Sequence, residues 1–551
     1  MKRTLIKLFC PHQKKFLISW LVTLIILGVL SLRLIDFGHL PSILNRDEAA
    51  LAYNAYLLKE IGLDEWGRAW PLTLESFGDY KLIGYPTILV GLFSLFGEND
   101  WVVRLPSFMA GLALALAIWK LSQCLGFSKS AGYLTVLMFA TTPIFFFYSR
   151  IAFEAHLALG LFVWGVYLLL SALDEKPLLS LKSVIGLLCL LMACLTYNTP
   201  LLFLPAVLPV LVIVGKQAKQ KVWWLASGLG LIFCLVVFWL WPVLSQKSGI
   251  TIFTDLTVWS NWILWRDQLP LLLKSSLGHR FLYWAGLMII NFVKSFSPDF
   301  LVTGGGAHPW HSLPNWGHLT WPIYGLGFLG MWRVVKDGLT HKFSQLTQLD
   351  HKRWGLLLLM ALSLAPAVVT VDAPHTTRSL FFIFIWVLWA GLGLDYLLSR
   401  LPTLAGKFKL KSSFPPKIKL LGLVIFVGLL IGNFAWYLGQ YWWQYPADQP
   451  RLFQAGFKQI IKQVDQDDSH QPVAIVDASG YQYILLAWYL KIDPELYLKT
   501  NIRQLPDTIG MKYGQQVDRY HFIAHQNDRS EAEKTLVWWD EVGQTWQRTD
   551  Y

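Results

Sequence analysis

Apolar runs of membrane length recur along most of the chain, separated by short polar segments. A helix of about 20 apolar residues crosses the hydrocarbon core of a bilayer. The first run, Phe16 to Ile35, follows basic residues and lacks a small-residue cleavage site, which indicates a retained anchor and not a signal peptide. The pattern predicts an α-helical multi-pass membrane protein with about eleven transmembrane helices. The further runs lie at 101–121, 128–148, 154–173, 180–197, 200–215, 223–244, 319–336, 354–371, 379–398 and 418–438.

The basic residues predict how these helices are oriented. Lysines and arginines cluster before the first run and in later loops at 216–221, 333–353 and 400–419. All of these loops lie on one side if the predicted spans alternate, and an excess of basic residues marks the cytoplasmic side of a membrane protein. The chain is therefore expected in the cell (cytoplasmic) membrane, with its N-terminus in the cytoplasm and its C-terminus outside.

The composition excludes some classes of protein. The chain is 54% hydrophobic and 15% charged, with a mean hydropathy of +0.43, which excludes an ordinary soluble domain. The net charge of +12 comes from loops beside apolar runs, so it indicates membrane orientation and no nucleic-acid partner. None of the cysteines falls in a predicted outer loop, so no disulfide framework is expected.

The first outer loop, residues 37–100, is longer than a connection requires. Within it, apolar residues at helical spacing predict a helix from Asp47 to Ile61 that lies along the membrane interface. The run from Tyr85 to Phe96 is too short to span a bilayer and predicts a second interfacial helix. A second long outer segment, 245–318, is rich in Trp, Pro, Gly and His.

The C-terminal tail differs in composition from the rest of the chain, because it is polar and charged. A strand at 472–477 and a helix at 480–491 are expected within it. The tail therefore predicts a small extracytoplasmic α/β domain at 441–551, which follows a transmembrane domain at 1–440.

Two adjacent carboxylates, Asp47 and Glu48, lie shortly after the first apolar run. Charged groups near a bilayer are costly to desolvate and are typical of functional sites. The alternative is structural: both residues would cap the interfacial helix and interact favourably with its dipole.

Other acids and bases fall on the same predicted side of the membrane, in separate loops. A shared pocket at this face is the functional interpretation. The alternatives are an interfacial position for each arginine, a surface ion pair in the first loop, and an ordinary loop histidine. These residues are Asp79, Lys81, Arg104, Arg150, Glu154, Asp372, His375 and Arg378.

Several motifs extend this pattern over roughly residues 15–400. The arrangement resembles the GT-C superfamily of polyprenyl-phosphate-dependent glycosyltransferases, specifically relatives of protein O-mannosyltransferases and of the lipid A aminoarabinose transferase. The motifs are Arg46-Asp47-Glu48-Ala49, Gly62-Leu63-Asp64-Glu65-Trp66-Gly67, Trp70-Pro71-Leu72, Phe77-Gly78-Asp79-Tyr80-Lys81, Tyr85-Pro86, Val103-Arg104-Leu105-Pro106-Ser107, Tyr148-Ser149-Arg150 with Glu154, and Phe296-Ser297-Pro298 leading to His311 and Gly317.

The resemblance implies roles for individual residues. Asp47 would be the base that deprotonates the acceptor, with Glu48 orienting acceptor or donor. Glu154 would be the second acidic position, where some relatives carry Asp. Lys81 and Arg378 would hold the lipid phosphate. The remaining substrate-binding candidates are Asp79, Arg150 and His375.

The chemistry of sugar transfer requires the same residue types. A carboxylate takes the proton of the acceptor, and cations stabilise the negative charge that grows on the departing phosphate. Direct displacement with a single base would invert the anomeric centre. A divalent metal ion is a further hypothesis, because Asp47, Glu48 and His375 include suitable ligand types, but no cofactor is identified by spacing.

The sequence therefore predicts a mannosyltransferase-like enzyme of the cell envelope. It would move a sugar from a polyprenyl-phosphate donor to a protein, lipid or glycan acceptor at the extracytoplasmic face, in contact with membrane lipids. One alternative is a transporter or flippase for lipid-linked glycans, whose charges would line a pathway at mid-span. Another is an assembly scaffold whose tail binds a partner.

Overall fold

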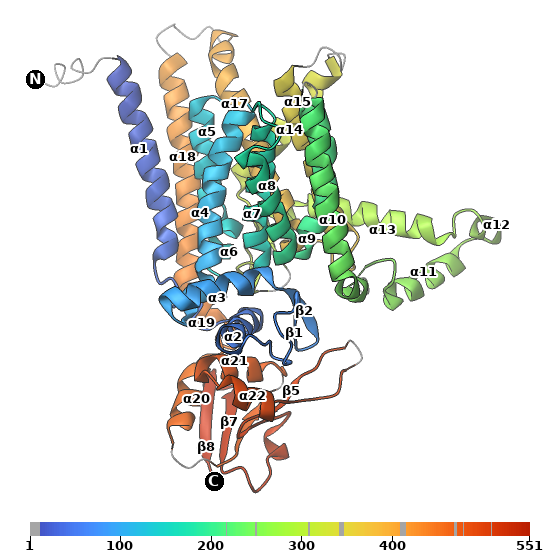
Figure 1. Ribbon diagram of the computed structural model, residues 1–551. Coiled ribbons are helices and arrows are strands. Elements are labelled where there is room, and N and C mark those ends of the chain that lie inside the picture. The colour runs from blue at the N-terminus through green and yellow to red at the C-terminus, as the bar shows by residue number, and fades with distance from the viewer. Residues whose placement is uncertain are drawn as a thin grey trace, which may run out of the picture.

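A bundle of long helices carries a smaller sheet domain at one end (Figure 1). The computed structural model describes residues 11–215, 218–247, 251–306, 309–340, 347–407, 415–467, 471–477, 479–507 and 510–551. Some of the basic residues that predict the orientation, among them Lys2, Lys7 and Lys216, lie outside these ranges.

Every apolar run predicted to span contains a helix of the bundle. Five of the described helices, α4, α7, α10, α17 and α18, are long and apolar enough to cross a membrane, and several others are shorter. The multi-pass helical fold is confirmed, whereas the number of spans remains a prediction. The bundle helices are α1 (Pro11–Ser31), α4 (Asp100–Cys124), α5 (Lys129–Ala140), α6 (Pro143–Tyr148), α7 (Glu154–Ala172), α8 (Leu181–Thr196), α9 (Asn198–Val214), α10 (Lys219–Lys247), α14 (Trp321–Thr340), α15 (Gln348–Ser363), α17 (Thr376–Lys407) and α18 (Pro415–Gly439).

The predicted span at 128–148 is not one continuous helix. Helix α5 ends at Ala140, and α6 begins at Pro143. Proline has no backbone N–H and is favoured in the first turn of a helix, so a new helix begins at Pro143.

Helix α17 runs through the centre of the bundle and packs closely on α14. A Cβ atom on Gly330 would lie 2.0 Å from the carbonyl oxygen of Trp389, and one on Gly393 would lie 2.1 Å from that of Leu326. Small residues at these positions let the two helices approach, which is how helices associate where the solvent is itself apolar.

The first loop folds across the end of the bundle, between the bundle and the sheet domain (Figure 1). It contains α2 (Arg46–Ile61), a hairpin of β1 (Thr73–Ser76) and β2 (Asp79–Leu82), and α3 (Gly84–Phe96). Asn45 caps α2 by accepting hydrogen bonds from the N–H groups of Asp47 and Glu48. Both helices predicted in this loop are therefore confirmed.

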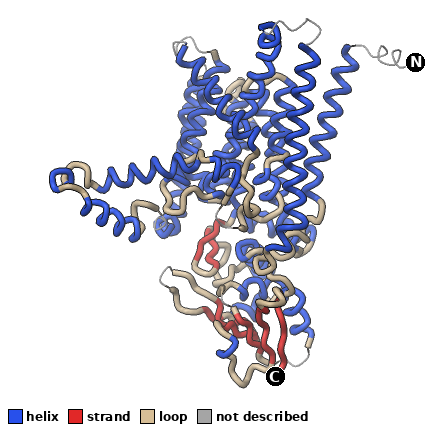
Figure 2. The backbone as a smooth tube through the Cα atoms, turned by 180° about the vertical axis from the view of Figure 1, so that it is seen from behind, coloured by secondary structure: helices blue, strands red, loops and turns tan. Residues whose placement is uncertain are grey.

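The second long segment forms an arm that projects from the side of the bundle (Figures 1 and 2). It consists of α11 (Leu256–Gln268), α12 (Leu271–Lys274) and α13 (Arg280–Ser295). A π-helical turn, η4 (Asp299–Thr303), leads from the arm back toward the bundle.

The tail forms the predicted α/β domain, shown with its strands in red in Figure 2. Its six-stranded sheet has the order β4-β5-β6-β3-β7-β8, with β3 parallel to both β6 and β7. The predicted strand and helix are β3 and α21. Helix α18 continues into this region through η6 (Gln440–Gln444) and α19 (Tyr445–Asp448). The other elements are α20 (Phe457–Gln466), β3 (Val473–Val476), α21 (Gln482–Leu490), α22 (Pro494–Thr500), β4 (Ile502–Arg503), β5 (Gly514–Val517), β6 (Tyr520–Ile523), η7 (Gln526–Asp528), β7 (Thr535–Asp540) and β8 (Thr545–Asp550).

One hydrophobic core joins the first loop to the α/β domain. It contains Tyr53 of α2 and Phe93 of α3 together with Tyr483 and Trp488 of α21. Burial of this apolar surface holds the first loop against the α/β domain.

Candidate functional site

An ion pair between Asp47 and Lys81 lies at the end of the bundle that carries the α/β domain. The Nζ atom of Lys81 is 2.7 Å from Oδ1 of Asp47 and 3.6 Å from Oδ2 of Asp79. Asp47 is in the first turn of α2, and Lys81 is on β2, opposite Leu74 in the antiparallel hairpin. The Lys81 side chain is buried, whereas the Asp47 side chain is 30% exposed.

The surrounding charges keep both partners ionised. Burial alone would raise the pKa of Asp47, but the cations of Lys81 and Arg46 lower it to about 2. Burial alone would lower the pKa of Lys81, but the carboxylates of Asp47, Glu154 and Asp79 raise it above its ordinary value. Glu154, the first residue of α7, therefore lies within electrostatic reach of the pair.

His311 connects this ion pair with the loop before α17. Its imidazole lowers the pKa of Asp47, and its ring centroid is 5.2 Å from that of His375. The Nδ1 atom of His311 is 3.0 Å from the hydroxyl oxygen of Tyr148, which holds the ring in place. We call the group of Asp47, Asp79, Lys81, Glu154, His311, His375 and Arg378 the charged cluster.

The loop at 371–378 supplies the last members of the charged cluster. Arg378 forms an ion pair with Asp372, and Nε2 of His375 is 3.8 Å from the same carboxylate. Burial would raise the pKa of Asp372, but Arg378 and His375 lower it. The hydroxyl of Thr377 lies 3.0 Å from Nδ1 of His375 and accepts a hydrogen bond from Tyr197 at 3.1 Å.

Glu48 faces a different partner from its neighbour Asp47, because successive side chains on a helix point about 100° apart. Its carboxylate is fully buried and lies 3.0 Å and 3.2 Å from two nitrogens of the fully buried Arg104. It also accepts hydrogen bonds from the N–H groups of Ala152 at 2.7 Å and Asn45 at 3.0 Å. These contacts tie α2 to α4 and to the start of α7.

Arg150 lies among backbone carbonyl groups and not among the side chains of the charged cluster. Its guanidinium donates to the carbonyl oxygens of Arg33, Asp36 and Leu40 at 2.6–3.1 Å and to the hydroxyl of Tyr441 at 3.1 Å. It therefore fixes the segment that follows α1.

The three predicted metal-ligand candidates do not gather at one point. The oxygens of Glu48 accept from Arg104 and from backbone N–H groups, and Asp47 pairs with Lys81. Within the described ranges, no group of three or more His, Cys, Asp or Glu side chains could hold a metal ion.

The α/β domain contacts the hairpin that carries Lys81. The N–H of Lys512 donates to the carbonyl oxygen of Phe77 at 3.1 Å, and Arg46 lies 4.2 Å over the ring of Tyr481. Arg503 forms a buried ion pair with Glu65 at 2.7 Å. The domain thus restrains the β1–β2 turn from the side opposite the bundle.

Sequence comparison gives a partial match to one enzyme family. Residues 83–241 match the family model described as dolichyl-phosphate-mannose-protein mannosyltransferase. No curated protein sequence matches the chain.

Solved structures share the architecture at low sequence identity. The apo oligosaccharyltransferase from Archaeoglobus fulgidus is 11% identical over 85% of this chain, with a TM-score of 0.50, and this chain covers 63% of its length. ArnT from Cupriavidus metallidurans is 15% identical over 86% of this chain and 84% of its own, with a TM-score of 0.48. The same ArnT bound to undecaprenyl phosphate is 14% identical over the same fractions, with a TM-score of 0.49.

These findings confirm the class predicted from the sequence. The oligosaccharyltransferase likeness shows the fold, and the family match lies within the helical bundle. The predicted resemblance to the GT-C superfamily is confirmed, and the chain is a membrane glycosyltransferase with the GT-C fold.

Proposed function

We propose that the charged cluster transfers a sugar from a polyprenyl-phosphate donor to a hydroxyl group of a protein, lipid or glycan acceptor. The observation that carries the proposal is that the Asp47–Lys81 ion pair lies within electrostatic reach of Glu154, and that His311 links it to His375 in the loop that leads to Arg378. Asp47 and Lys81 come from the first loop, Glu154 from the start of α7, and Arg378 from the start of α17. The transfer would take place at the extracytoplasmic face of the cytoplasmic membrane.

In this proposal Asp47 is the base, and Lys81 and Arg378 bind the phosphate of the donor. Lys81 would interact with both the phosphate and Asp47, because its ammonium group contacts the Asp47 carboxylate. A donor phosphate beside Lys81 would weaken the interaction between Lys81 and Asp47 and so raise the pKa of the Asp47 carboxylate. The carboxylate would then be a better proton acceptor. Binding of the donor would thus activate the base.

The remaining predicted residues would support this arrangement. Glu154 and Asp79 keep Lys81 charged, and His375 positions Arg378 through their common partner Asp372. Glu48 and Arg150 would act by positioning α2 and the segment after α1, because their polar atoms are occupied by Arg104 and by backbone groups. Direct displacement with one base predicts inversion at the anomeric carbon.

The location of the charged cluster favours a transferase over a transporter. A pathway for a lipid-linked glycan would place ionisable groups near the middle of the bundle. The charged cluster instead includes residues of α2 and β2, which lie across one end of the bundle (Figure 1).

Replacement of Lys81 by methionine tests the phosphate-binding role. We expect the dissociation constant for undecaprenyl phosphate to rise about 10- to 100-fold, because a hydrogen bond to a charged group contributes about 1.5–3 kcal/mol. The measurement is equilibrium binding to the purified protein in nanodiscs. Lys59→Met is the matched control, since Lys59 is on the adjacent helix α2 and pairs with Glu60 and Glu98. Equal affinity of wild type and Lys81→Met would contradict the proposal.

The pH dependence of kcat/KM tests the coupling between Lys81 and Asp47. Because Lys81 and Arg46 lower the pKa of Asp47 to about 2, the free wild-type enzyme should keep Asp47 ionised throughout the range above about pH 3. In Lys81→Met the main cause of the lowered pKa is gone, so the fall of kcat/KM on the acidic side should begin at higher pH. Identical acid limbs in the two proteins would show that Asp47 is not the titrating base.

A further inference from the structure

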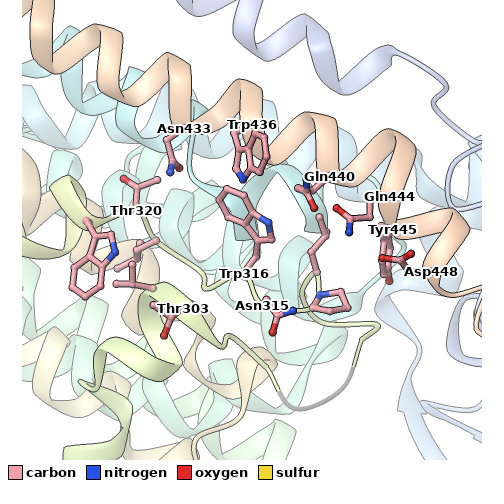
Figure 3. Close-up of a pocket in the computed structure, with 15 residues that line it drawn as sticks. Thr303, Asn315, Trp316, Thr320, Asn433, Trp436, Gln440, Gln444, Tyr445 and Asp448 are labelled. Atoms are coloured by element: carbon pink, nitrogen blue, oxygen red, sulfur yellow. The ribbon is translucent and has the colours of Figure 1, made fainter.

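A cavity lies beside the segment that carries His311, a member of the charged cluster. It has a volume of about 450 Å³ and is lined by the outer part of α18, η6 and α19 and by residues 302–303, 313–316 and 319–321 (Figure 3). Its size is within the range of about 300–1,000 Å³ typical of small-molecule sites. From its lining we propose that this cavity binds an uncharged sugar residue of the acceptor.

One wall of the cavity is a row of amide side chains on a single helix face. Asn433, Gln440 and Gln444 are seven and four residues apart, which places them on one face of α18 and its continuation. Figure 3 shows them along the same side of this helix, with the indole of Trp436 among them. The helix becomes a π-helix at Gln440–Gln444, a distortion often found at functional sites.

The opposite wall is rigid because two chain segments are joined by backbone hydrogen bonds. The N–H of Leu319 donates to the carbonyl oxygen of Leu301 at 2.7 Å, and that of Gly317 donates to Val302 at 3.1 Å. A Cβ atom at Gly317 would lie 2.2 Å from the backbone of Val302, so only glycine fits. Trp316 on this wall packs against Tyr437 with ring centroids 5.2 Å apart.

The chemistry of the lining selects for hydroxyl groups and against phosphate. Amide side chains both donate and accept hydrogen bonds, as the hydroxyl groups of a sugar do, and an indole face offers apolar surface to a sugar ring. Among the described residues of the lining there is no Lys or Arg, and Asp448 is the charged residue. A phospholipid headgroup or a second polyprenyl phosphate would meet a carboxylate there and no cation.

Two polar atoms of the lining residues lack a partner in the described part of the chain. They are Oγ1 of the buried Thr320 and Oδ1 of Asn433. A buried polar atom without a hydrogen bond costs about 1–3 kcal/mol, so a ligand that satisfies these atoms would bind favourably. A general aromatic belt at the membrane interface explains the exposed Trp436, but it does not explain amides and unpaired oxygens on residues that line the same cavity.

The site's role as an acceptor subsite rests on the proposed function, because His311 links this segment to Asp47. The orientation of the segment supports it: His311 faces the charged cluster, whereas Leu313, Asn315 and Trp316 line the cavity. A sugar held here would keep its acceptor chain beside the base.

The test measures the binding of neutral sugars to the full chain in nanodiscs. The nanodiscs are prepared without maltoside detergent, because the sugar headgroup of such a detergent would compete with the probes for the cavity. The probes are mannobiose, maltotriose and chitobiose, observed by saturation-transfer NMR, with glycerol phosphate as the anionic comparison. We expect at least one neutral probe to bind, and its affinity to fall about tenfold in Asn433→Leu/Gln440→Leu, which removes two amide partners. Trp443→Leu is the matched control, because Trp443 is on the same helix but outside the cavity.

The outcomes separate this proposal from the proposed function. No binding of any neutral probe, binding unchanged in Asn433→Leu/Gln440→Leu, or preferential binding of glycerol phosphate would each overturn the sugar site. If the same sugar binds more tightly when it is attached to a lipid, the acceptor is a glycolipid. If the free and the lipid-attached sugar bind equally, the acceptor is a soluble glycan. Both outcomes support the sugar site. Asp47→Asn should bind the sugar as wild type does, so the sugar site is tested independently of transfer.

Discussion

Replacement of Asp47 by asparagine is expected to lower kcat by about 10²- to 10⁴-fold, the usual contribution of a general base. Asparagine has nearly the same shape and still offers an oxygen to Lys81 at the position of Oδ1, but it cannot take a proton from the acceptor. The variant should therefore fold, insert into membranes and bind the donor. Initial rates of sugar transfer from a polyprenyl-phosphate donor give the measurement.

Asp79→Asn is the matched control for this variant. Asp79 lies in the same charged cluster, 3.6 Å from Lys81, but its side chain is 40% exposed and farther from the ammonium group than Asp47 is. We expect its rate to stay within several-fold of wild type, since exposed pairs contribute little. Transfer by Asp47→Asn at the wild-type rate, or an equal loss in both variants, would contradict the assignment of Asp47 as the base.

Replacement of Arg104 by methionine is expected to destabilise the protein by about 3–5 kcal/mol, because it leaves the Glu48 carboxylate buried without a counter-charge. The loss should appear in both folding stability and activity, since Glu48 also joins α2 to Ala152 in the segment just before α7. Thermal unfolding of the purified protein in nanodiscs measures the change.

The double variant Arg104→Met/Glu48→Gln separates charge from packing. It removes both charges, so it should recover part of the stability lost by Arg104→Met. If the single variant is as stable as wild type, or the double variant is less stable than the single one, the buried pair does not hold α2 in place.

Most helices of the bundle and of the first loop could be predicted because they depend on local sequence. Apolar runs of membrane length give the bundle helices, and the helical spacing of apolar residues after Asp47 gives α2. The break between α5 and α6 follows from Pro143 and was missed because apolarity continues through it. The arm formed by α11 to α13 could not be predicted, because its direction depends on contacts with the bundle and not on its own pattern.

The site could be predicted only where partners are close in sequence or belong to a motif. Asp47 and Lys81 are both in the first loop, and each belongs to a motif that indicated it as a candidate site residue. Glu48 and Arg104 are a pair because α4 passes beside α2, and periodicity alone does not say which helices are neighbours. For the same reason Glu48 had two open interpretations, and its participation in the cap of α2 became visible only with the structure.

His311 shows the limit of sequence reasoning more clearly. It belongs to a segment rich in aromatic residues and glycine without helical or strand periodicity, so no local signal directs it to Asp47. The signal for His311 in the sequence was its place after the motif Phe296-Ser297-Pro298. Tyr148, which contacts His311, belongs to a motif that gave no indication of this contact, and Tyr197, which contacts Thr377, lies at the end of an apolar run.

Photolabelling with a polyprenyl phosphate that carries a reactive group next to its phosphate tests the central claim most directly. If distant segments form one phosphate site, the labelled peptides should contain the β1–β2 hairpin, the start of α7 and the loop at 371–378, and excess undecaprenyl phosphate should abolish the labelling. Labels confined to the opposite end of the bundle, at the end of α14, the start of α15 or the first turns of α10, would contradict it.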